Sequence, residues 1–248
     1  MTKTGIDCIS YYVPRLFLDI KTLAVARGIE PDKLTKGLGL TVMALTDIDE
    51  DTATMAAEAA LKLIEDNGID PRTVGRLYLG TESALDSAKP TATYVSAILE
   101  EALENKYGAR CLKNCDVLDM TFACVGAVDA LHNSLEWVRG GKDRKAIVIA
   151  ADFAKYALAS AGEYSQGAVA MLVSQEPRLF SVGEDFGGGM HSEGDFYKPH
   201  HAFDKKVLLA AVLRAAGLDA DEKAVDGTLS NLSDDGFWGH ADTKVLIH

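Results

Sequence analysis

The sequence predicts an α/β fold in which a mixed, mostly parallel sheet carries helices on both of its faces. Short apolar segments of strand length alternate with longer amphipathic segments that have the 3.6-residue period of helices. This alternation is the order in which parallel strands and their crossover helices follow one another. Because 48% of the 248 residues are hydrophobic, the chain can bury a sizeable core.

The expected elements are bounded by residues that stop strands and helices. Pro14 ends the first apolar strand, and Gly68 lies near the end of an amphipathic helix whose first turn, from Asp49, is acidic. The segments expected as strands are, in order, 5–14, 74–79 (which runs into Gly80, Thr81 and Glu82), 115–121, 144–154, 167–174 and 178–185. The segments expected as helices are 49–68, 91–108, 125–141 and 204–217.

The regular pattern loosens in the last third of the chain. The two last expected strands are joined by a turn at Glu176 and Pro177. Residues 186–203 are rich in Gly and His and have no period, and the last six residues form a possible strand. We therefore expect two parts, residues 1–175 and residues 176–248.

Composition excludes several classes of protein. The formal net charge of −12, from 37 acidic and 25 basic residues, would repel a phosphate backbone, so no nucleic-acid partner is expected. No window approaches about 18 consecutive apolar residues and the N-terminus has no signal-like apolar run, so we expect no membrane partner and a cytoplasmic location. Four cysteines are too few for a secreted disulfide framework. Cys111 and Cys115 lack the second pair that a closed zinc site requires, so no metal is expected.

Two residues are candidates for chemistry because each follows an expected strand. Ligands of open α/β sheets bind outside the carboxyl ends of strands, where both Glu82 and Cys124 are expected. A cysteine at a helix entrance is favoured as the nucleophilic thiolate, and a carboxyl group desolvated near a thiol could move protons near neutral pH. The residues alone leave two alternatives open: Cys124 as a small buried side chain, and Glu82 as a cap for the following helix.

Seven segments follow one another along the chain: GIDCISYYVPRLFLDIKTLAVARGIEPDKLTKGLG, DEDTATMAAEAAL, LYLGTESALDSAKP, DMTFACVGAVDAL, VIAADFAKYA, QGAVAMLV and DFYKP. Together they resemble 3-hydroxy-3-methylglutaryl-CoA synthases, which belong to the thiolase-fold superfamily. The resemblance runs from the first residues to about Pro199, and several independent motifs agree.

The resemblance implies a thiolase-like fold, with residues 1–175 as the N-terminal half and the remainder as an incomplete second half. It implies that Cys124 accepts the acetyl group of acetyl-CoA as a thioester, and that Glu82 then removes a proton from the acetyl methyl so that the carbanion equivalent attacks acetoacetyl-CoA. Ser160 aligns with a hydroxyl residue that contacts substrate, although an ordinary loop serine is an equal alternative. The substrates would be coenzyme A thioesters of the mevalonate pathway, with no cofactor, and the chain would form a homodimer.

The sequence also departs from the family. Members use a histidine of the second half to polarise acetoacetyl-CoA and lysines to grip the CoA phosphates, and no segment here matches either with confidence. The alternative is therefore a half-length, degenerate relative that binds acyl groups as a subunit or interaction module without full catalysis. A ketoacyl synthase fits less well, because the GTES and DFYKP motifs speak against it. If the whole reaction does proceed, the substitute for the missing group is expected among five histidines: His191, His200, His201, His240 and His248.

Overall fold

The computed structural model describes residues 3–37, 39–122, 125–153, 166–189, 191, 203–229 and 237–238. The chain divides into two compact units, Met1–Asp185 and Phe186–His248. Over the described ranges, no helix combines the length and the apolar character that crossing a membrane requires.

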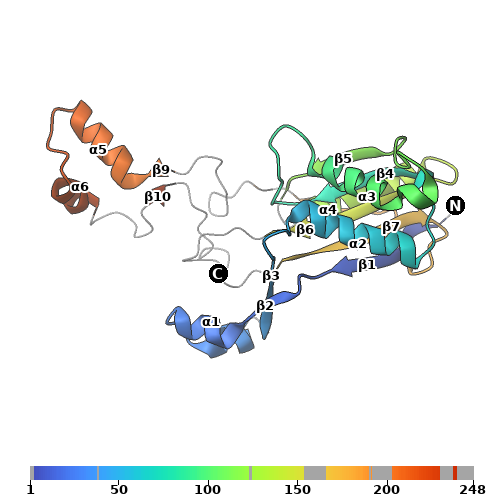
Figure 1. Cartoon of the computed structure of the whole chain (residues 1–248), viewed down its shortest axis with the longest axis horizontal. Helices are drawn as coiled ribbons and strands as arrows, with labels where there is room; N and C mark the ends of the chain where they lie inside the picture. The colour runs from blue at the N-terminus through green and yellow to red at the C-terminus, as the bar shows by residue number, and fades with distance from the viewer. Residues whose placement is uncertain are drawn as a thin grey trace. The chain divides into compact units, whose positions relative to one another are not determined.

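A mixed sheet forms the centre of the first unit (Figure 1). In the described part it has six strands, of which β4, β5, β6 and β1 run in one direction while β7 and β8 run in the other. The predicted mixed, mostly parallel sheet is thereby confirmed. From edge to edge the strands are β5 (Asp116–Met120), β4 (Val74–Gly80), β6 (Lys145–Asp152), β7 (Gly167–Gln175), β1 (Thr4–Tyr12) and β8 (Phe180–Ser181).

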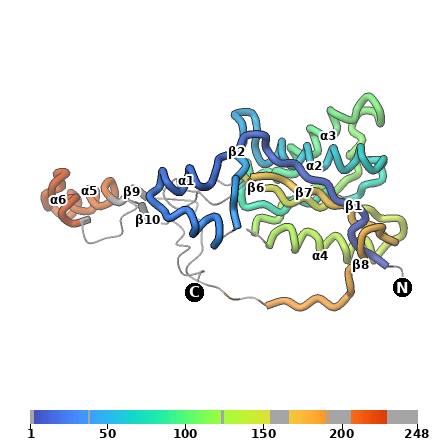
Figure 2. The backbone as a smooth tube through the Cα atoms, turned by 90° about the horizontal axis from the view of Figure 1, so that it is seen from below, coloured from blue at the N-terminus to red at the C-terminus, as the bar shows by residue number. Residues whose placement is uncertain are grey.

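The two faces of the sheet are covered by different helices (Figure 2). Helices α2 (Thr52–Asp66) and α3 (Thr91–Tyr107) cover one face, and α4 (Gly126–Arg139) covers the other. Side chains alternate along a strand, so Ile147 and Ile149 of β6 join the α2 and α3 core while Val148 joins the α4 core. A short 3-10 helix, η2 (Pro71–Thr73), leads into β4.

An arm that we did not predict as separate elements extends between β1 and α2. It contains β2 (Leu16–Asp19), α1 (Ile20–Ala26), the π-helix η1 (Lys33–Gly37) and β3 (Val42–Leu45). Strands β2 and β3 pair in antiparallel fashion, and the Asp19 carboxylate caps α1 by accepting the Thr22 N–H at 2.8 Å. The arm has a small core of its own, formed by Ile20, Ala24, Leu34 and Met43.

The end of the first unit differs from the expected boundary at residue 175. Strand β8 pairs with β1, not with β7, although a turn at Glu176 connects β7 to β8. The Glu176 N–H also bonds to the Lys3 carbonyl at 2.8 Å. These non-local contacts place residues up to Asp185 in the first compact unit.

The second unit contains a helix pair. Helix α5 (Lys205–Ala215) confirms the helix expected at 204–217, and α6 (Glu222–Leu229) follows it. An ion pair of 2.7 Å joins Lys206 Nζ to Asp226 Oδ1. The backbones of β9 (Phe203–Asp204) and β10 (Phe237–Trp238) pair in antiparallel fashion. The possible strand at the end of the chain lies outside the described residues.

Candidate functional site

Glu82 lies in the loop that follows β4, at the carboxyl end of the parallel strands, as predicted. The neighbouring strand β6 ends at Asp152, and this carboxylate holds the loop. Asp152 Oδ1 accepts the backbone N–H of Glu82 at 2.8 Å and the Thr81 hydroxyl at 3.0 Å. The Ser83 hydroxyl lies 3.0 Å from Asp152 Oδ1 and 2.9 Å from the Phe153 carbonyl, so its single proton is shared between them. The half-buried Glu82 is therefore presented on an anchored loop.

The Asp152 carboxyl is itself electrostatically perturbed. Burial raises its pKa above the usual value, and the hydrogen bonds from Glu82, Thr81 and Ser83 oppose that rise without cancelling it. The nearby Glu82 charge also raises the pKa of Asp152. Asp152, a half-buried acid with a perturbed pKa, and a second carboxylate thus lie at one end of the sheet, an arrangement typical of functional sites.

Two glycines bring the end of β4 against the start of α4 and the end of β5. A Cβ on Gly80 would meet the backbone N of Ala127 at 2.1 Å, and a Cβ on Gly126 would meet the Met120 carbonyl oxygen at 2.2 Å. Only glycine permits so close an approach of two backbones. The start of α4 therefore abuts the end of β4, two residues before Glu82 in the chain.

The nearest described residues around Cys124 are Phe122 and Val125. Phe122 O accepts the N–H groups of Val125 and Gly126, both at 2.9 Å, which turns the chain from β5 into α4. Cys124 itself and the predicted substrate-contacting Ser160 lie outside the described residues. The structure brings the flanks of Cys124 to the loop of Glu82, and the roles of Cys124, Glu82 and Ser160 remain predictions.

The far end of the loop is also held. Asp119, at the end of β5, accepts the backbone N–H groups of Thr91 and Ala92 at 2.5 and 2.8 Å and so caps α3. The Thr91 hydroxyl accepts the Leu85 N–H at 3.0 Å. The alternative in which Glu82 caps the following helix receives no support, because the described caps of α3 come from Asp119.

The other cysteines are poor nucleophiles. Burial raises the pKa of Cys115 to about 12, and burial likewise raises the pKa of Cys8 and of Cys111. All three are therefore thiols at neutral pH. Within the described ranges, no three His, Cys, Asp or Glu side chains are placed to hold one metal ion.

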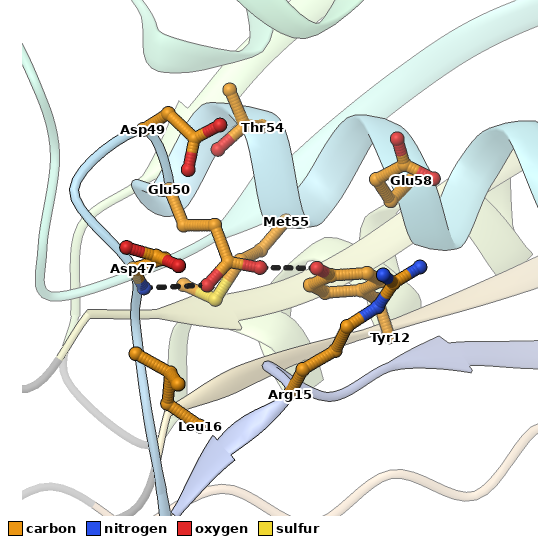
Figure 3. A pocket seen from close by; sticks show the side chains of 9 residues that line it. All are labelled: Tyr12, Arg15, Leu16, Asp47, Asp49, Glu50, Thr54, Met55 and Glu58. Carbon is orange, nitrogen blue, oxygen red and sulfur yellow. Dashed lines mark hydrogen bonds between the residues drawn. The ribbon is translucent and has the colours of Figure 1, made fainter.

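A cavity of about 460 Å³ opens beside the base of the arm (Figure 3). Tyr12 at the end of β1 donates its hydroxyl hydrogen bond to Glu50, whose other oxygen accepts the Asp47 N–H at 2.7 Å. The bond to Glu50 is the main reason that the pKa of Tyr12 rises to about 12. The lining residues are Tyr12, Arg15, Leu16, Asp47, Asp49, Glu50, Thr54, Met55 and Glu58.

The sequence of residues 1–177 matches the family described as hydroxymethylglutaryl-coenzyme A synthase N terminal. The chain belongs to the hydroxymethylglutaryl-CoA synthase family. A hydroxymethylglutaryl-CoA synthase of Haloferax volcanii is 37% identical over 208 residues, which are 82% of this chain and 46% of that protein. One from Mycosarcoma maydis is 36% identical over 251 residues, covering 98% of this chain and 52% of that protein. The chain thus spans about half the length of the curated relatives it matches.

Solved structures agree with this family membership. MvaS in complex with 3-hydroxy-3-methylglutaryl coenzyme A superimposes with a TM-score of 0.71 at 34% identity, over 94% of this chain and 56% of that one. A hydroxymethylglutaryl-CoA synthase complexed with CoA gives a TM-score of 0.71 at 26% identity, over 92% of this chain and 57% of that one. The predicted thiolase-like fold and the predicted family are confirmed.

Sequence reasoning missed Asp152 and Asp119 as anchors of the loop. Each is an acidic residue at the carboxyl end of an apolar strand, the same signal that singled out Glu82. An acidic residue that ends a buried strand could therefore have been predicted to lie at the site.

Proposed function

We propose that the chain performs the acetyl-transfer chemistry of hydroxymethylglutaryl-CoA synthase. The observation that carries the proposal is the contact of Gly80 with the start of α4, which sets the loop of Glu82 beside the flanks of Cys124. A nucleophile and a carboxylate from adjacent strand ends are the two groups that this reaction needs at one place. Coenzyme A thioesters are the proposed substrates, and the proposed chemistry needs no resident cofactor.

The proposed reaction has three steps. The Cys124 thiolate attacks the acetyl carbonyl of acetyl-CoA, and the CoA thiolate leaves, which yields an acetyl thioester on Cys124. Glu82 then takes a proton from the acetyl methyl, and the resulting carbanion equivalent attacks the ketone carbon of acetoacetyl-CoA. The ketone oxygen becomes an alkoxide, which takes up a proton to give the 3-hydroxyl group. Water finally hydrolyses the Cys124 thioester and releases the product. Ser160 is the proposed contact of the substrate.

Peptide mass spectrometry after incubation with acetyl-CoA tests the first step. We expect an acetyl adduct on Cys124, because the described thiols of Cys8, Cys111 and Cys115 are held protonated. An adduct on one of those three with none on Cys124 would overturn the proposal. Glu82→Ala should still load acetyl but lose exchange of the methyl protons with deuterated water. Equal loss of both steps would assign Glu82 a structural role.

A second candidate function is an acyl-binding subunit that loads Cys124 and does not complete the condensation. The sequence observation in its favour is that no segment matches the family histidine and lysines. Acetyl loading without 3-hydroxy-3-methylglutaryl-CoA formation, when acetoacetyl-CoA is supplied, would select this function.

The proposal extends to assembly and location. Leu118 of the edge strand β5 and Phe122 beyond it are 41% and 46% exposed, so a homodimer would remove apolar surface from water there. We propose a cytoplasmic location, which is supported by a relative of Gallus gallus, 34% identical over 210 residues, whose name includes that compartment. Sedimentation at micromolar concentration tests the dimer, and a stable monomer would count against it.

A further inference from the structure

Gln166 connects the base of the arm to the end of the sheet. Its side-chain oxygen accepts the backbone N–H of Thr46 at 2.6 Å, across 120 residues of sequence. Gln166 directly precedes Gly167, the first residue of β7, and Gly167 pairs with Asp152 in the sheet register. The Thr46 amide is thus tied to the strand end that carries Asp152.

Hydrogen bonds hold the segment from residue 46 to residue 52 at several points. Glu50 bonds to Tyr12 and to the Asp47 N–H, as Figure 3 shows. The Asp51 carboxylate then caps α2 by accepting the Thr54 N–H at 2.8 Å. These bonds link the segment between the arm and α2 to β1 at Tyr12 and to the first turn of α2.

The far end of this segment holds the loop of Glu82. The Thr52 hydroxyl donates to the Ser83 carbonyl at 2.9 Å, and the Thr52 side chain is fully buried. The Ser83 hydroxyl lies 3.0 Å from Asp152 Oδ1, and Asp152 pairs with Gly167. The hydrogen bonds therefore form a closed ring that runs from Gln166 through residues 46–52 and the loop to Asp152, and back to β7.

We propose that Gln166 is a positioning residue for Glu82, acting through Thr46 and Thr52. The inference rests on the proposed function only for its kinetic consequence, because the ring itself is structural. If the Gln166 oxygen is removed, the Thr46 N–H loses its partner, residues 46–52 gain freedom, and the Ser83 carbonyl is held less well. Small misplacements of a reacting group can cost about 100-fold in rate, so we expect slower proton removal by Glu82.

Gln166→Met tests the inference, because methionine matches the length of glutamine and lacks the acceptor oxygen. The matched control is Gln175→Met, at the opposite end of the same strand, where Gln175 Nε2 donates to the Gly141 carbonyl at 2.9 Å. Gln166→Glu keeps an acceptor oxygen for the Thr46 N–H and should therefore retain the amide exchange and the proton exchange of the unaltered chain. The first readout is amide hydrogen exchange at Thr46 and at Glu82, and the second is the exchange of acetyl-methyl protons after loading.

We expect Gln166→Met to speed amide exchange at both Thr46 and Glu82, and to slow methyl-proton exchange about 10- to 100-fold while acetyl loading changes little. Thr52→Val removes the hydroxyl donor to the Ser83 carbonyl. In a chain that already carries Thr52→Val, adding Gln166→Met should change the amide exchange at Glu82 only slightly. Faster exchange at Thr46 with unchanged exchange at Glu82 would overturn the inference, as would equal effects of Gln166→Met and Gln175→Met. If the unaltered chain takes no acetyl group, the proposed function fails, and the amide exchange at Glu82 still decides the role of Gln166.

Discussion

The carboxylate of Asp152 accepts the backbone N–H of Glu82 at 2.8 Å, so one acidic residue fixes the backbone of another. The two come from neighbouring parallel strands, because β4 ends just before Glu82 and β6 ends at Asp152. A carboxylate that accepts main-chain and hydroxyl hydrogen bonds holds a loop rigidly. Asp152 thus explains how a residue on a surface loop can have a defined position.

Replacing Asp152 separates its role as an acceptor from its charge. Asp152→Ala leaves the Glu82 N–H and the Thr81 hydroxyl without this partner, and should lower the free energy of unfolding by about 2 to 4 kcal/mol. Asp152→Asn keeps an oxygen acceptor and should cost less. Urea unfolding at pH 7 measures both variants, and equal losses would show that the charge, and not the acceptor, holds the loop.

The charge of Asp152 should make the free energy of unfolding depend on pH. Because the folded-state pKa is raised above the unfolded value, ionisation of Asp152 costs the folded state free energy. Its effect on stability is therefore most favourable below about pH 3.9 and becomes unfavourable as pH rises through the folded pKa. The unfolding free energy of Asp152→Asn, relative to the unaltered chain, should increase from pH 4 to pH 7. A constant difference would contradict the raised pKa.

The close approach at Gly80 and Gly126 predicts strong destabilisation by a single methyl group. In Gly126→Ala the new Cβ would lie 2.2 Å from the Met120 carbonyl oxygen. This oxygen belongs to the backbone, so it cannot move away as the end of a flexible side chain could. We expect a loss of about 2 to 3 kcal/mol, together with slower acetylation of Cys124. Gly37→Ala is the control, because its Cβ would meet nothing within 4 Å. Thermal unfolding compares the two variants, and equal melting temperatures would refute the close approach.

The Tyr12 bond to Glu50 should stabilise the chain at neutral pH and fail in alkali. The pKa of Tyr12 is raised to about 12, so the neutral hydroxyl is favoured in the folded state. This contribution is fully present below pH 10, the unfolded value, and is lost as pH rises through 12. Tyr12→Phe should lower the unfolding free energy by about 1 kcal/mol at pH 8. The difference should shrink at pH 11, and a difference that grows with pH would contradict the assignment.

The sheet and its three large helices could be predicted because their signals are local. The apolar run of β6 is typical of a strand, and the period of α2 is typical of a helix. Pro14 marks the end of the first strand, and Gly68 marks the end of α2. The arm gave no such signal, because its strands have four residues and its α-helix seven, too short for a period to show. Strand β8 has two residues and pairs with β1 at Gly5, a partner that no local pattern indicates.

The candidate site was predictable only in part, for a related reason. Glu82 could be placed at a strand end from its own neighbours in sequence. The anchoring by Asp152 depends on the pairing of β4 with β6, and the tie between Thr46 and Gln166 joins residues 120 positions apart. Such contacts follow from strand order, which composition and periodicity do not specify.

The last prediction concerns the whole reaction of this polypeptide tested alone. Condensation needs a carbanion equivalent on the acetyl group and a polarised acetoacetyl-CoA ketone within about 3 to 3.5 Å. Cys124 and Glu82 are proposed to supply the first, whereas no segment of the sequence matches the family histidine that supplies the second. Losing one donor aimed at a developing oxyanion costs about 100- to 1,000-fold in rate.

We therefore expect acetylation of Cys124 but formation of 3-hydroxy-3-methylglutaryl-CoA at only about 0.01 to 0.1 per second, against the roughly 10 per second of a typical enzyme. Chromatography of the products from acetyl-CoA and acetoacetyl-CoA measures this, with Cys124→Ala as the blank. Turnover of about 1 per second or faster would contradict the expectation. It would direct attention to the histidines of the second unit as the substitute donor. Of these, only His191 falls within the described residues, while His200, His201, His240 and His248 lie outside them. Replacing each of the five by alanine would then identify the donor as the one whose loss removes condensation and spares acetylation.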